Sequence, residues 1–569
     1  MLSGDITQLV VAHPVVSHLV SLTISVWLTY LCVIKHGGFV SDDLQGIAEY
    51  DGKLQGREYG MVSRWVRYHL CGGNFPSGDS VTTPDNRKLS IPCGKIPWRH
   101  HALSVVVFNL SIIVTYFFLA PIIGNTLSFL TLLLFSVHPV CTQIVAWCSG
   151  IGYPLSLLWM SLSAILARWY YQSDKDLFTT IWTLGLFAIL QYLGINALFI
   201  GLMLWPILVF LGYYEFAAVS FLISIVLGLQ IVKHTIGIRV SAFKEQEMAH
   251  STIPNWRKVI VATKTLGYYI KHALLPMQMG LYHEWGYHYN KNLERENKLF
   301  FVSLLAVLSM SYVFLTTDIL PIRLGILWFV SFLFIFLNWI TIQQFVTERY
   351  VAIPSIGFCM IIAYFTQSYL PIFFLLYGLY LMRTWMHLPT YDDELRFYES
   401  NVWNFKKSEV AYGNLGVTHL RFGRIMTAID DWHHAINVNP QYDVPYYNIY
   451  SHYKSNALNA INNGNYQYGV DLLKQSYPYL DKARSCEICH FRVQWTKELE
   501  EVAEWIKNPL TIVHKEKERL EKLQVDLDKM LVEAKDDKRK QEISSSIVDC
   551  NLRLKHIETM LSKNETFKT

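Results

Sequence analysis

The feature that most constrains this chain is the separation of its apolar and charged residues into two regions. Residues from about Leu9 to Trp385 form apolar runs with brief polar breaks, whereas the sequence after Met386 is rich in charge. Hydrophobic residues make up 52% of the 569 residues and charged residues only 17%, which is little charge for a soluble protein of this size. The pattern predicts a polytopic membrane domain followed by a soluble region.

The apolar runs predict transmembrane helices, because a span needs roughly 20 apolar residues and somewhat fewer inside a bundle. The N-terminus has no basic region before the first run and no small-residue cleavage site after it, so we expect this run to remain as a signal anchor. The sequence predicts about eleven spans, at residues 13–34, 102–120, 122–138, 152–170, 177–193, 195–213, 215–232, 299–316, 322–345, 350–369 and 371–385.

Two long polar stretches, residues 35–101 and 233–298, interrupt this membrane domain. The second contains an amphipathic segment, Trp256 to Ile270, which we place in the membrane interface. An odd span count puts both stretches and the C-terminal region on the side opposite the N-terminus. The few basic residues of the short loops lie on the N-terminal side, which predicts that this side is cytoplasmic. The C-terminal region is then extracytoplasmic, at the endoplasmic reticulum or a bacterial inner membrane.

The sequence predicts an all-α fold with a membrane domain over residues 1–390 and two helical parts after it. Residues 400–508 carry residues at tetratricopeptide spacing, namely Leu415-Gly416, Gly423, Ala428, Trp432, Ala435 and Pro440. Residues 509–569 show hydrophobic 3-4 spacing with a polar break at Asp536-Asp537, which predicts a helical hairpin or coiled coil.

Three short polar motifs fall on the same predicted side of the membrane. They are Asp42-Asp43 after the first span, His138 at the end of the third, and Glu348-Arg349-Tyr350 at the end of the ninth. Charged groups near a membrane are costly unless they serve a site. The aspartate pair fits an N-cap, a general base that takes a proton from a hydroxyl, or a divalent-cation site.

The other motifs suggest a phosphate-bearing ligand. Arg349 has the planar fork that binds phosphate, although an ion pair with a neighbouring helix explains it equally well. His138 precedes a proline and fits either a core residue or a catalytic residue, while Lys271 and His283 add polar groups on the same side. A carboxylate with phosphate-binding cations at a membrane interface predicts a lipid-phosphate-linked donor.

Cysteines give two further motifs. Cys71 and Cys93 share one loop and are compatible with a disulfide or with two free thiols. Cys486, Cys489 and His490 form a C-x-x-C-H pattern, which is that of covalent haem c but also fits a chance match, a disulfide or a zinc site. We expect no requirement for haem or a divalent metal. The net charge of +4 is spread out, so nucleic acid is not an expected partner.

Four segments resemble the family C glycosyltransferases, and most closely the transmembrane and tetratricopeptide-repeat protein O-mannosyltransferases. They are Phe39–Tyr50 (FVSDDLQGIAEY), Leu132–Gly150 (LLLFSVHPVCTQIVAWCSG), Lys271–Gly280 (KHALLPMQMG) and Thr347–Phe358 (TERYVAIPSIGF). The resemblance covers roughly residues 10–475. Two places differ from the family pattern: Gln143 stands for a glutamate, and Ile151-Gly152-Tyr153 stands for Arg-x-Asp/Glu.

The resemblance implies transfer of a sugar, typically mannose, from a polyprenyl phosphate to a hydroxyl of a protein acceptor, without a metal. Asp42 or Asp43 would be the catalytic base, Arg349 would contact the lipid phosphate, and His138 would lie near the donor. Membrane lipids would surround the domain. The alternative is a catalytically inactive scaffold of the same fold that binds partner proteins through residues 400–563.

Overall fold

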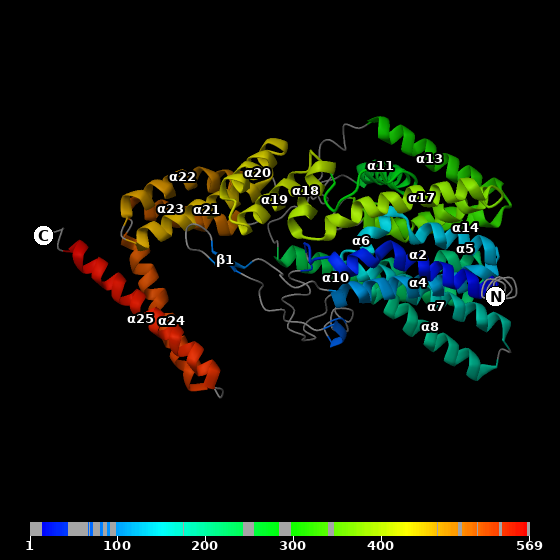
Figure 1. The fold of residues 1–569 in the computed structure, drawn as a ribbon, viewed down its shortest axis with the longest axis horizontal. Coiled ribbons are helices and arrows are strands. Elements are labelled where there is room, and N and C mark those ends of the chain that lie inside the picture. Colours follow the sequence, from blue (N-terminus) through cyan, green and yellow to red (C-terminus); the bar gives the residue numbers. More distant parts are fainter. Residues whose placement is uncertain are drawn as a thin grey trace, which may run out of the picture. The chain divides into compact units, whose positions relative to one another are not determined.

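The computed structural model (Figure 1) describes most of the membrane-domain helices and the C-terminal helices. The described residues are 14–41, 43, 67, 69–71, 80–82, 88–90, 98–173, 176–242, 255–283, 297–339, 346–463, 465–486, 492–508, 510–533 and 537–565. Their only strands are β1 (Ser80–Thr82) and β2 (Lys88–Ser90), which pair antiparallel. Apart from this short ribbon the described structure is helical, as the sequence predicted.

The chain divides into two compact units. The first unit comprises residues 1–242 and 247–431, and the second comprises residues 243–246 and 432–569. Helix α20 (Ile425–Val438) runs across the division, so the boundary lies inside the region predicted to form helical repeats. The predicted boundary near residue 390 stays a prediction.

The first unit is built from helices joined by short 3₁₀ turns. Its helices are α2 (Pro14–His36), α4 (Trp98–Ile123), α5 (Asn125–Ser136), α6 (Thr142–Val145), α7 (Gly152–Gln172), α8 (Leu177–Ala197), α9 (Trp205–Phe210), α10 (Tyr214–Ala242), α11 (Asn255–Leu274), α13 (Asn297–Thr316), α14 (Leu320–Leu333), α15 (Glu348–Ala352), α16 (Ser355–Thr366), α17 (Leu370–His387), α18 (Glu394–Asn404) and α19 (Glu409–Arg421). The turns are η2 (Pro139–Cys141), η3 (Cys148–Ile151), η4 (Phe199–Met203), η5 (Phe334–Phe336) and η6 (Leu388–Tyr391).

Fewer helices than expected are long and apolar enough to cross a membrane. Among the described residues there are five, namely Pro14–His36, Trp98–Ile123, Cys148–Gln172, Leu177–Ala197 and Leu299–Thr316. Helices α5 and η2–α6 form a pair bent by 62°, which gives six if the pair counts as one span. The sequence predicted eleven, because hydropathy measures the length of an apolar run and not the breaks within it.

Proline accounts for several of these breaks. His138 has the extended backbone (φ −63°, ψ 128°) that a following proline favours, and α5 therefore ends before Pro139. Pro354 lies between α15 and α16, which divides the predicted span 350–369. The predicted span 195–213 is divided in the same way into η4 and α9.

Small residues let two of the shorter helices approach closely. A Cβ atom on Gly357 of α16 would lie 2.2 Å from the carbonyl oxygen of Gly325 on α14. Close backbone approach through small residues is typical of helices packed inside membranes. Beside this contact the buried Trp328 donates its indole Nε1 to the carbonyl oxygen of Ile353 at 3.0 Å, which ties α14 to the turn before α16.

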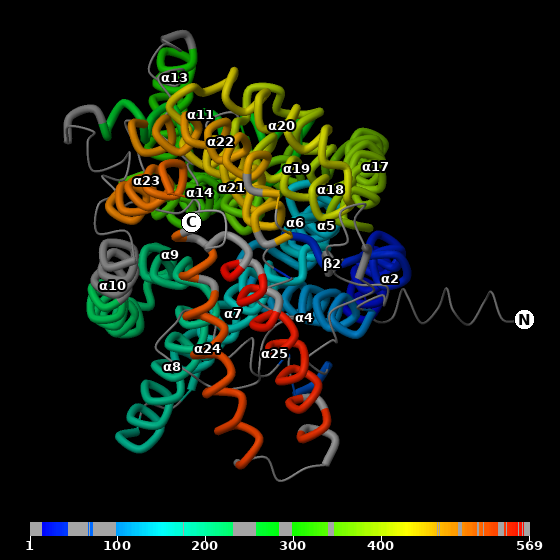
Figure 2. Tube along the Cα trace, turned by 90° about the vertical axis from the view of Figure 1, so that its left-hand side faces the viewer, coloured from blue at the N-terminus to red at the C-terminus, as the bar shows by residue number. Residues whose placement is uncertain are grey.

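The second unit is a set of helices with its own apolar core. They are α21 (Asp443–Asn462), α22 (Tyr466–Ser485), α23 (Arg492–Lys507), α24 (Leu510–Glu533) and α25 (Asp537–Glu565). Helices α24 and α25 lie side by side (Figure 2), and the Cys550 thiol donates to the carbonyl oxygen of Leu520 between them. A helix pair lies where the sequence predicted one. The tetratricopeptide repeat and the coiled coil stay predictions.

Candidate functional site

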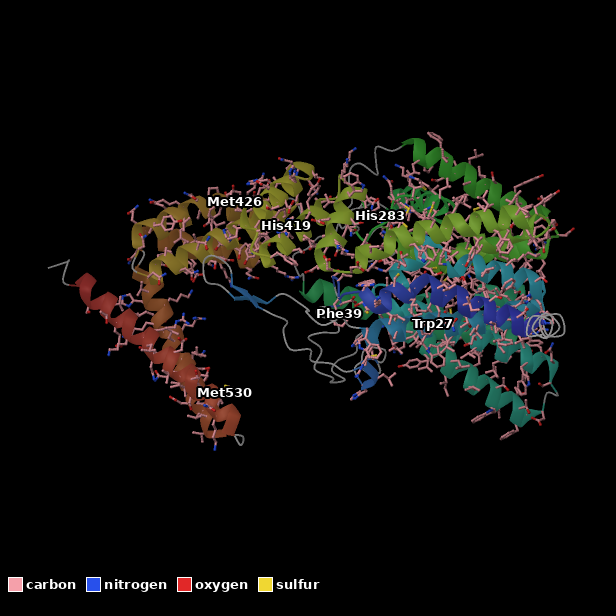
Figure 3. All side chains as sticks on the ribbon, in the orientation of Figure 1. Trp27, Phe39, His283, His419, Met426 and Met530 are labelled. Carbon is pink, nitrogen blue, oxygen red and sulfur yellow. The ribbon has the colours of Figure 1, made fainter. Side chains whose placement is uncertain are left out.

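Polar side chains from well-separated segments meet at one end of the helices of the first unit. Figure 3 labels Phe39 and His283, which both lie at the end of these helices away from the N-terminus. Trp147 donates its indole Nε1 to the carbonyl oxygen of Val40 at 3.2 Å, and His101 Nε2 donates to that of Gly38 at 3.2 Å. We call the following residues the polar cluster: Asp43, Arg67, Gln143, Trp147, His283, Glu348, Arg349 and Tyr391.

Asp43 is fully buried and accepts four hydrogen bonds. Its Oδ1 atom accepts from the backbone N–H and the hydroxyl of Ser149, both at 2.6 Å. Its Oδ2 atom accepts from the backbone N–H of Cys148 at 3.2 Å and from that of Val40 at 3.4 Å. Burial raises the pKa of Asp43 to about 6, although the Ser149 hydrogen bonds and the charge of Arg67 oppose the rise. Asp43 thereby joins the segment after α2 to η3.

Arg67 is a member of the cluster that the sequence did not reveal. Its side chain is buried, and Nη2 donates to the hydroxyl of Ser104 on α4 at 3.0 Å. The guanidinium is close enough to Asp43 to lower the pKa of that carboxyl. Arg67 stands in a polar stretch with several other basic residues, so no local signal distinguishes it in the sequence.

Gln143 fixes the start of α15. Its side-chain Oε1 accepts from the backbone N–H of Arg349 at 2.8 Å and from the hydroxyl of Thr347 at 2.9 Å. The backbone N–H of Thr347 in turn donates to the hydroxyl of Tyr269 on α11 at 3.2 Å. The segment after η2 and the end of α11 therefore both position Glu348 and Arg349.

Arg349 lies between aromatic rings. Its guanidinium carbon is 5.0 Å from the centre of the Trp147 ring and 5.2 Å from that of Tyr350, within the range of cation–π attraction. The Tyr350 ring stacks on Phe336 at 4.3 Å, and the Tyr153 hydroxyl lies beside the guanidinium. Tyr153 occupies the position where the resemblance leads one to expect a carboxylate, so a neutral group neighbours Arg349 there.

Glu348 anchors the loop after α11. Its Oε1 atom accepts from the backbone N–H of Gly280 at 2.8 Å and lies 2.9 Å from His283 Nε2, with both side chains about 1% exposed. Burial by itself would raise the pKa of Glu348, but the charge and hydrogen bond of His283 hold that pKa below its ordinary value. The other ring nitrogen of His283 bonds to the hydroxyl of Tyr268. Glu348 and His283 thus form a buried pair.

Two predicted site residues lie apart from the cluster's contacts. His138 is fully buried, donates from Nε2 to the carbonyl oxygen of Ala273 at 2.9 Å, and accepts at Nδ1 from the backbone N–H of Val140 at 3.4 Å. Both ring nitrogens are therefore hydrogen-bonded to backbone groups. Of the roles considered for His138, this is that of a core residue. Lys271 is exposed at the end of α11.

Several predicted residues fall wholly or partly outside the described structure. Asp42, Cys93, Cys489 and His490 are not among the described residues. The buried Cys71 thiol donates to the carbonyl oxygen of Arg99 at 3.5 Å, and the Cys486 thiol donates to that of Lys482 at 3.2 Å. The predicted disulfide and the C-x-x-C-H motif stay predictions. Within the described ranges no group of three or more His, Cys, Asp or Glu side chains is arranged to hold a metal.

Tyr391 is a second cluster member that the sequence did not reveal. It is buried at the end of η6, and its backbone carbonyl accepts from the N–H of Gly38 at 2.9 Å. Burial and the nearby charge of Glu348 raise the pKa of Tyr391 well above its ordinary value, with Arg349 and Asp43 also within electrostatic range. It is therefore a neutral hydroxyl among the charged groups of the cluster. It follows the last predicted span, where the sequence indicated only a linker.

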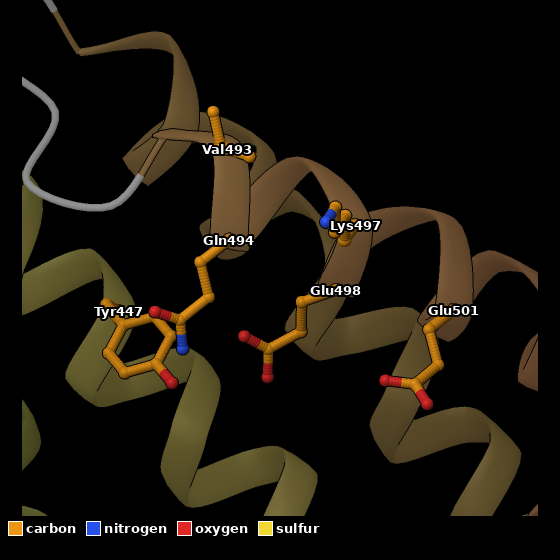
Figure 4. A pocket seen from close by; sticks show the side chains of 6 residues that line it. All are labelled: Tyr447, Val493, Gln494, Lys497, Glu498 and Glu501. Atoms are coloured by element: carbon orange, nitrogen blue, oxygen red, sulfur yellow. The ribbon is translucent and has the colours of Figure 1, made fainter. Parts of the chain in front are cut away.

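The second unit has a separate groove (Figure 4), about 800 Å³ in volume. Its lining residues are Tyr447, Val493, Gln494, Lys497, Glu498 and Glu501. Glu498 accepts a hydrogen bond from the Tyr450 hydroxyl at 2.8 Å and forms an ion pair with Lys454, while Glu501 pairs with Lys515. The acidic groups of this groove are therefore paired within the unit.

Comparisons with protein-family models, with curated proteins and with solved structures each find no match to the chain. The resemblance to the family C glycosyltransferases therefore rests on its four sequence segments.

Proposed function

We propose that the protein is a membrane glycosyltransferase that moves a sugar, mannose in the first instance, from a polyprenyl phosphate to a Ser or Thr hydroxyl of a protein. One observation carries the proposal: all four segments of the resemblance meet in the polar cluster. Trp147 bonds to Val40, Gln143 bonds to Arg349, and Gly280 bonds to Glu348. Residues that are distant in the sequence are thereby assembled around one group of charges.

Arg349 is the proposed phosphate-binding residue. Its guanidinium is held over Trp147 and beside Tyr350 and Tyr153, which fixes the orientation of a planar cation in the polar cluster. Such a group binds phosphate with two parallel hydrogen bonds. The neutral Tyr391 hydroxyl nearby adds a further donor without adding charge.

We propose Asp42 as the base and Asp43 as the residue that positions it. A general base needs an accessible carboxylate near its substrate. Asp43 is fully buried and its two oxygens already accept four hydrogen bonds. The adjacent Asp42 then takes the proton from the acceptor hydroxyl.

The reaction proposed is a single displacement. The acceptor hydroxyl gives its proton to Asp42 while its oxygen bonds to the anomeric carbon of the sugar. The bond from that carbon to the phosphate oxygen breaks, and the electron pair leaves with the polyprenyl phosphate. Arg349 stabilises the negative charge that develops on the phosphate, which is the kind of interaction that contributes most to such steps.

We place the cluster on the extracytoplasmic side of the endoplasmic reticulum or of a bacterial inner membrane. The first four crossing segments support one common side, because the end of α2, the start of α4, the end of α5 and the start of α7 all meet at the cluster. The proposed chemistry uses carboxylate, guanidinium and hydroxyl groups and needs no metal.

The test is transfer from radiolabelled polyprenyl-phosphate mannose to a Ser/Thr-rich acceptor by the purified full-length protein. Asp42→Asn should abolish transfer while the melting temperature stays that of the wild type. Asp43→Asn should lower both, since it weakens the bonds that hold the loop. Full activity of Asp42→Asn would overturn the assignment of the base, and wild-type protein that neither binds nor turns over the donor would overturn the proposed function.

The second candidate is a non-catalytic scaffold of the same fold that binds partners through residues 400–563. It is favoured by Gln143 and Tyr153, which are neutral where the resemblance leads one to expect carboxylates. The groove beside α23 offers a separate surface on the second unit. Donor binding without turnover, together with stoichiometric co-purification of a partner lost in Glu501→Lys, would favour this function.

A further inference from the structure

Gln143 of the polar cluster carries a buried hydrogen-bond donor with no acceptor among the described residues. The side chain of Gln143 is 1% exposed, and its Nε2 atom makes no hydrogen bond. Its Oε1 atom, in contrast, accepts two. A buried donor left unsatisfied destabilises the folded state, so such a group in a native protein calls for a ligand or water.

The orientation of the Gln143 amide is fixed by its partners. A backbone N–H can only donate, so the atom that faces the N–H of Arg349 must be the oxygen. The amide nitrogen therefore carries the two unused N–H bonds. Flipping the amide would oppose its N–H₂ group to the N–H of Arg349 and lose the bond that holds the start of α15.

The position of this amide indicates which ligand it serves. Gln143 bonds to the backbone N–H of Arg349, and the guanidinium of Arg349 lies over the ring of Trp147, four residues after Gln143 in the chain. An N–H donor needs an oxygen acceptor, and the ligand proposed for Arg349 is a phosphate with several acceptor oxygens. We infer that Gln143 Nε2 donates to a non-bridging phosphate oxygen of the polyprenyl-phosphate donor. This inference rests on the proposed function.

The neutral charge of Gln143 is part of the inference. A glutamate is nearly the same shape and would keep the bonds from Thr347 and Arg349, but its second oxygen would face the phosphate as an acceptor with negative charge. An amide in the same place supplies hydrogen bonds and no repulsion. Glutamine in place of the family's glutamate then strengthens donor binding without changing the position of α15.

The experiment measures binding of two probes, polyprenyl phosphate and polyprenyl-phosphate mannose, to the full-length protein in detergent. Gln143→Glu should weaken both by the same factor, about 10- to 100-fold, which corresponds to one hydrogen bond to a charged group. Gln143→Met removes the donor without adding charge but also loses the Oε1 acceptor that holds the start of α15, so it should weaken binding of both probes and lower the melting temperature as well. The matched control is Gln367→Glu, a half-buried glutamine at the end of α16, which should leave both affinities unchanged.

The outcomes distinguish a failure of the Gln143–phosphate contact from a failure of the proposed function. Equal loss for both probes in Gln143→Glu, with a melting temperature within a few degrees of the wild type, supports a contact with phosphate. Loss for the mannose-bearing probe alone would overturn the phosphate assignment, because the amide would then contact the sugar. Unchanged affinities in both variants would overturn it in favour of water as the amide's partner. Absence of binding by the wild type would instead defeat the proposed function.

Discussion

Charged side chains of the two units are held in different ways. In the polar cluster Asp43 and Glu348 are fully enclosed, and their oxygens accept hydrogen bonds from backbone N–H groups of other segments. In the groove of the second unit the Glu498 side chain is still 13% exposed and is paired with the side chains of Lys454 and Tyr450. The first arrangement organises the chain, whereas the second stabilises two neighbouring helices.

This difference has a physical consequence. Loss of a buried acceptor leaves backbone donors without water to replace it, and each such donor costs about 1–3 kcal/mol. The Lys454–Glu498 pair keeps some contact with water, so its loss costs less, about 1 kcal/mol, because water can partly solvate both partners. Substitutions in the polar cluster should therefore affect folding and function together. Those in the groove should affect either one only slightly.

The largest effect is expected at Asp43. Asp43→Ala removes the acceptor for the backbone N–H groups of Val40, Cys148 and Ser149, and should lower the free energy of unfolding by about 4 kcal/mol. Thermal unfolding in detergent measures the change. Asp471→Ala, at an exposed aspartate of the second unit, is the control and should be neutral. A melting temperature equal to that of the wild type would contradict the organising role of Asp43.

Glu348 should follow with a somewhat smaller effect. Glu348→Ala leaves His283 and the N–H of Gly280 without their carboxylate, at a cost of about 3 kcal/mol in the free energy of unfolding. Glu348→Gln retains the Oε1 acceptor and should cost about half as much. Chemical denaturation of the three proteins gives the comparison. Equal stability of the two variants would mean that the retained Oε1 acceptor contributes nothing, which would contradict the proposed anchoring of the Gly280 N–H.

The sequence predicted which residues form the cluster better than it predicted their contacts with one another. Span parity predicted one common membrane side for Asp43, Glu348 and Arg349, which stays a prediction, and the structure brings the three residues into one cluster. Parity could not show that Glu348 pairs with His283, because that contact depends on the loop after α11. Arg67 and Tyr391 carry no local pattern, since one stands in a polar stretch and the other follows the last apolar run. The span count failed for a similar reason, because breaks inside a run hardly change its mean hydropathy.

The buried His272 is expected to make the folded protein less stable at acid pH. Burial, followed by the charge of His283, lowers the pKa of His272 to about 3, so the folded protein keeps this imidazole neutral. The unfolded chain binds a proton near pH 6.5, hence stability is complete above that pH and falls as the pH drops toward 3. At pH 5.5 the loss is about 1 kcal/mol.

The test compares acid sensitivity in two phenylalanine variants. His272→Phe leaves nothing to protonate, so the fall in melting temperature between pH 7 and pH 5.5 should be smaller than in the wild type. His433→Phe, at an exposed histidine of the second unit, should leave that fall unchanged. An identical pH dependence in His272→Phe and the wild type would show that His272 is accessible to protons in the folded state.

The smallest effect is expected in the groove. Glu498→Gln keeps an acceptor for the Tyr450 hydroxyl and removes only the charge that faces Lys454, at a cost of about 0.5 kcal/mol. Because Lys454 also lies over the rings of Tyr450 and Trp505, part of its interaction survives the substitution.

Measuring the stability of Glu498→Gln at high salt tests more sharply whether the groove and the polar cluster hold their charges differently. In 1 M salt the Debye length is about 3 Å, so the difference between Glu498→Gln and the wild type should largely vanish. The difference for Glu348→Gln should persist, because that pair is buried. The control Glu500→Gln, at an exposed position of the same helix, should match the wild type throughout. A salt-resistant loss of 2 kcal/mol or more for Glu498→Gln would mean that the groove is as strongly organised as the polar cluster.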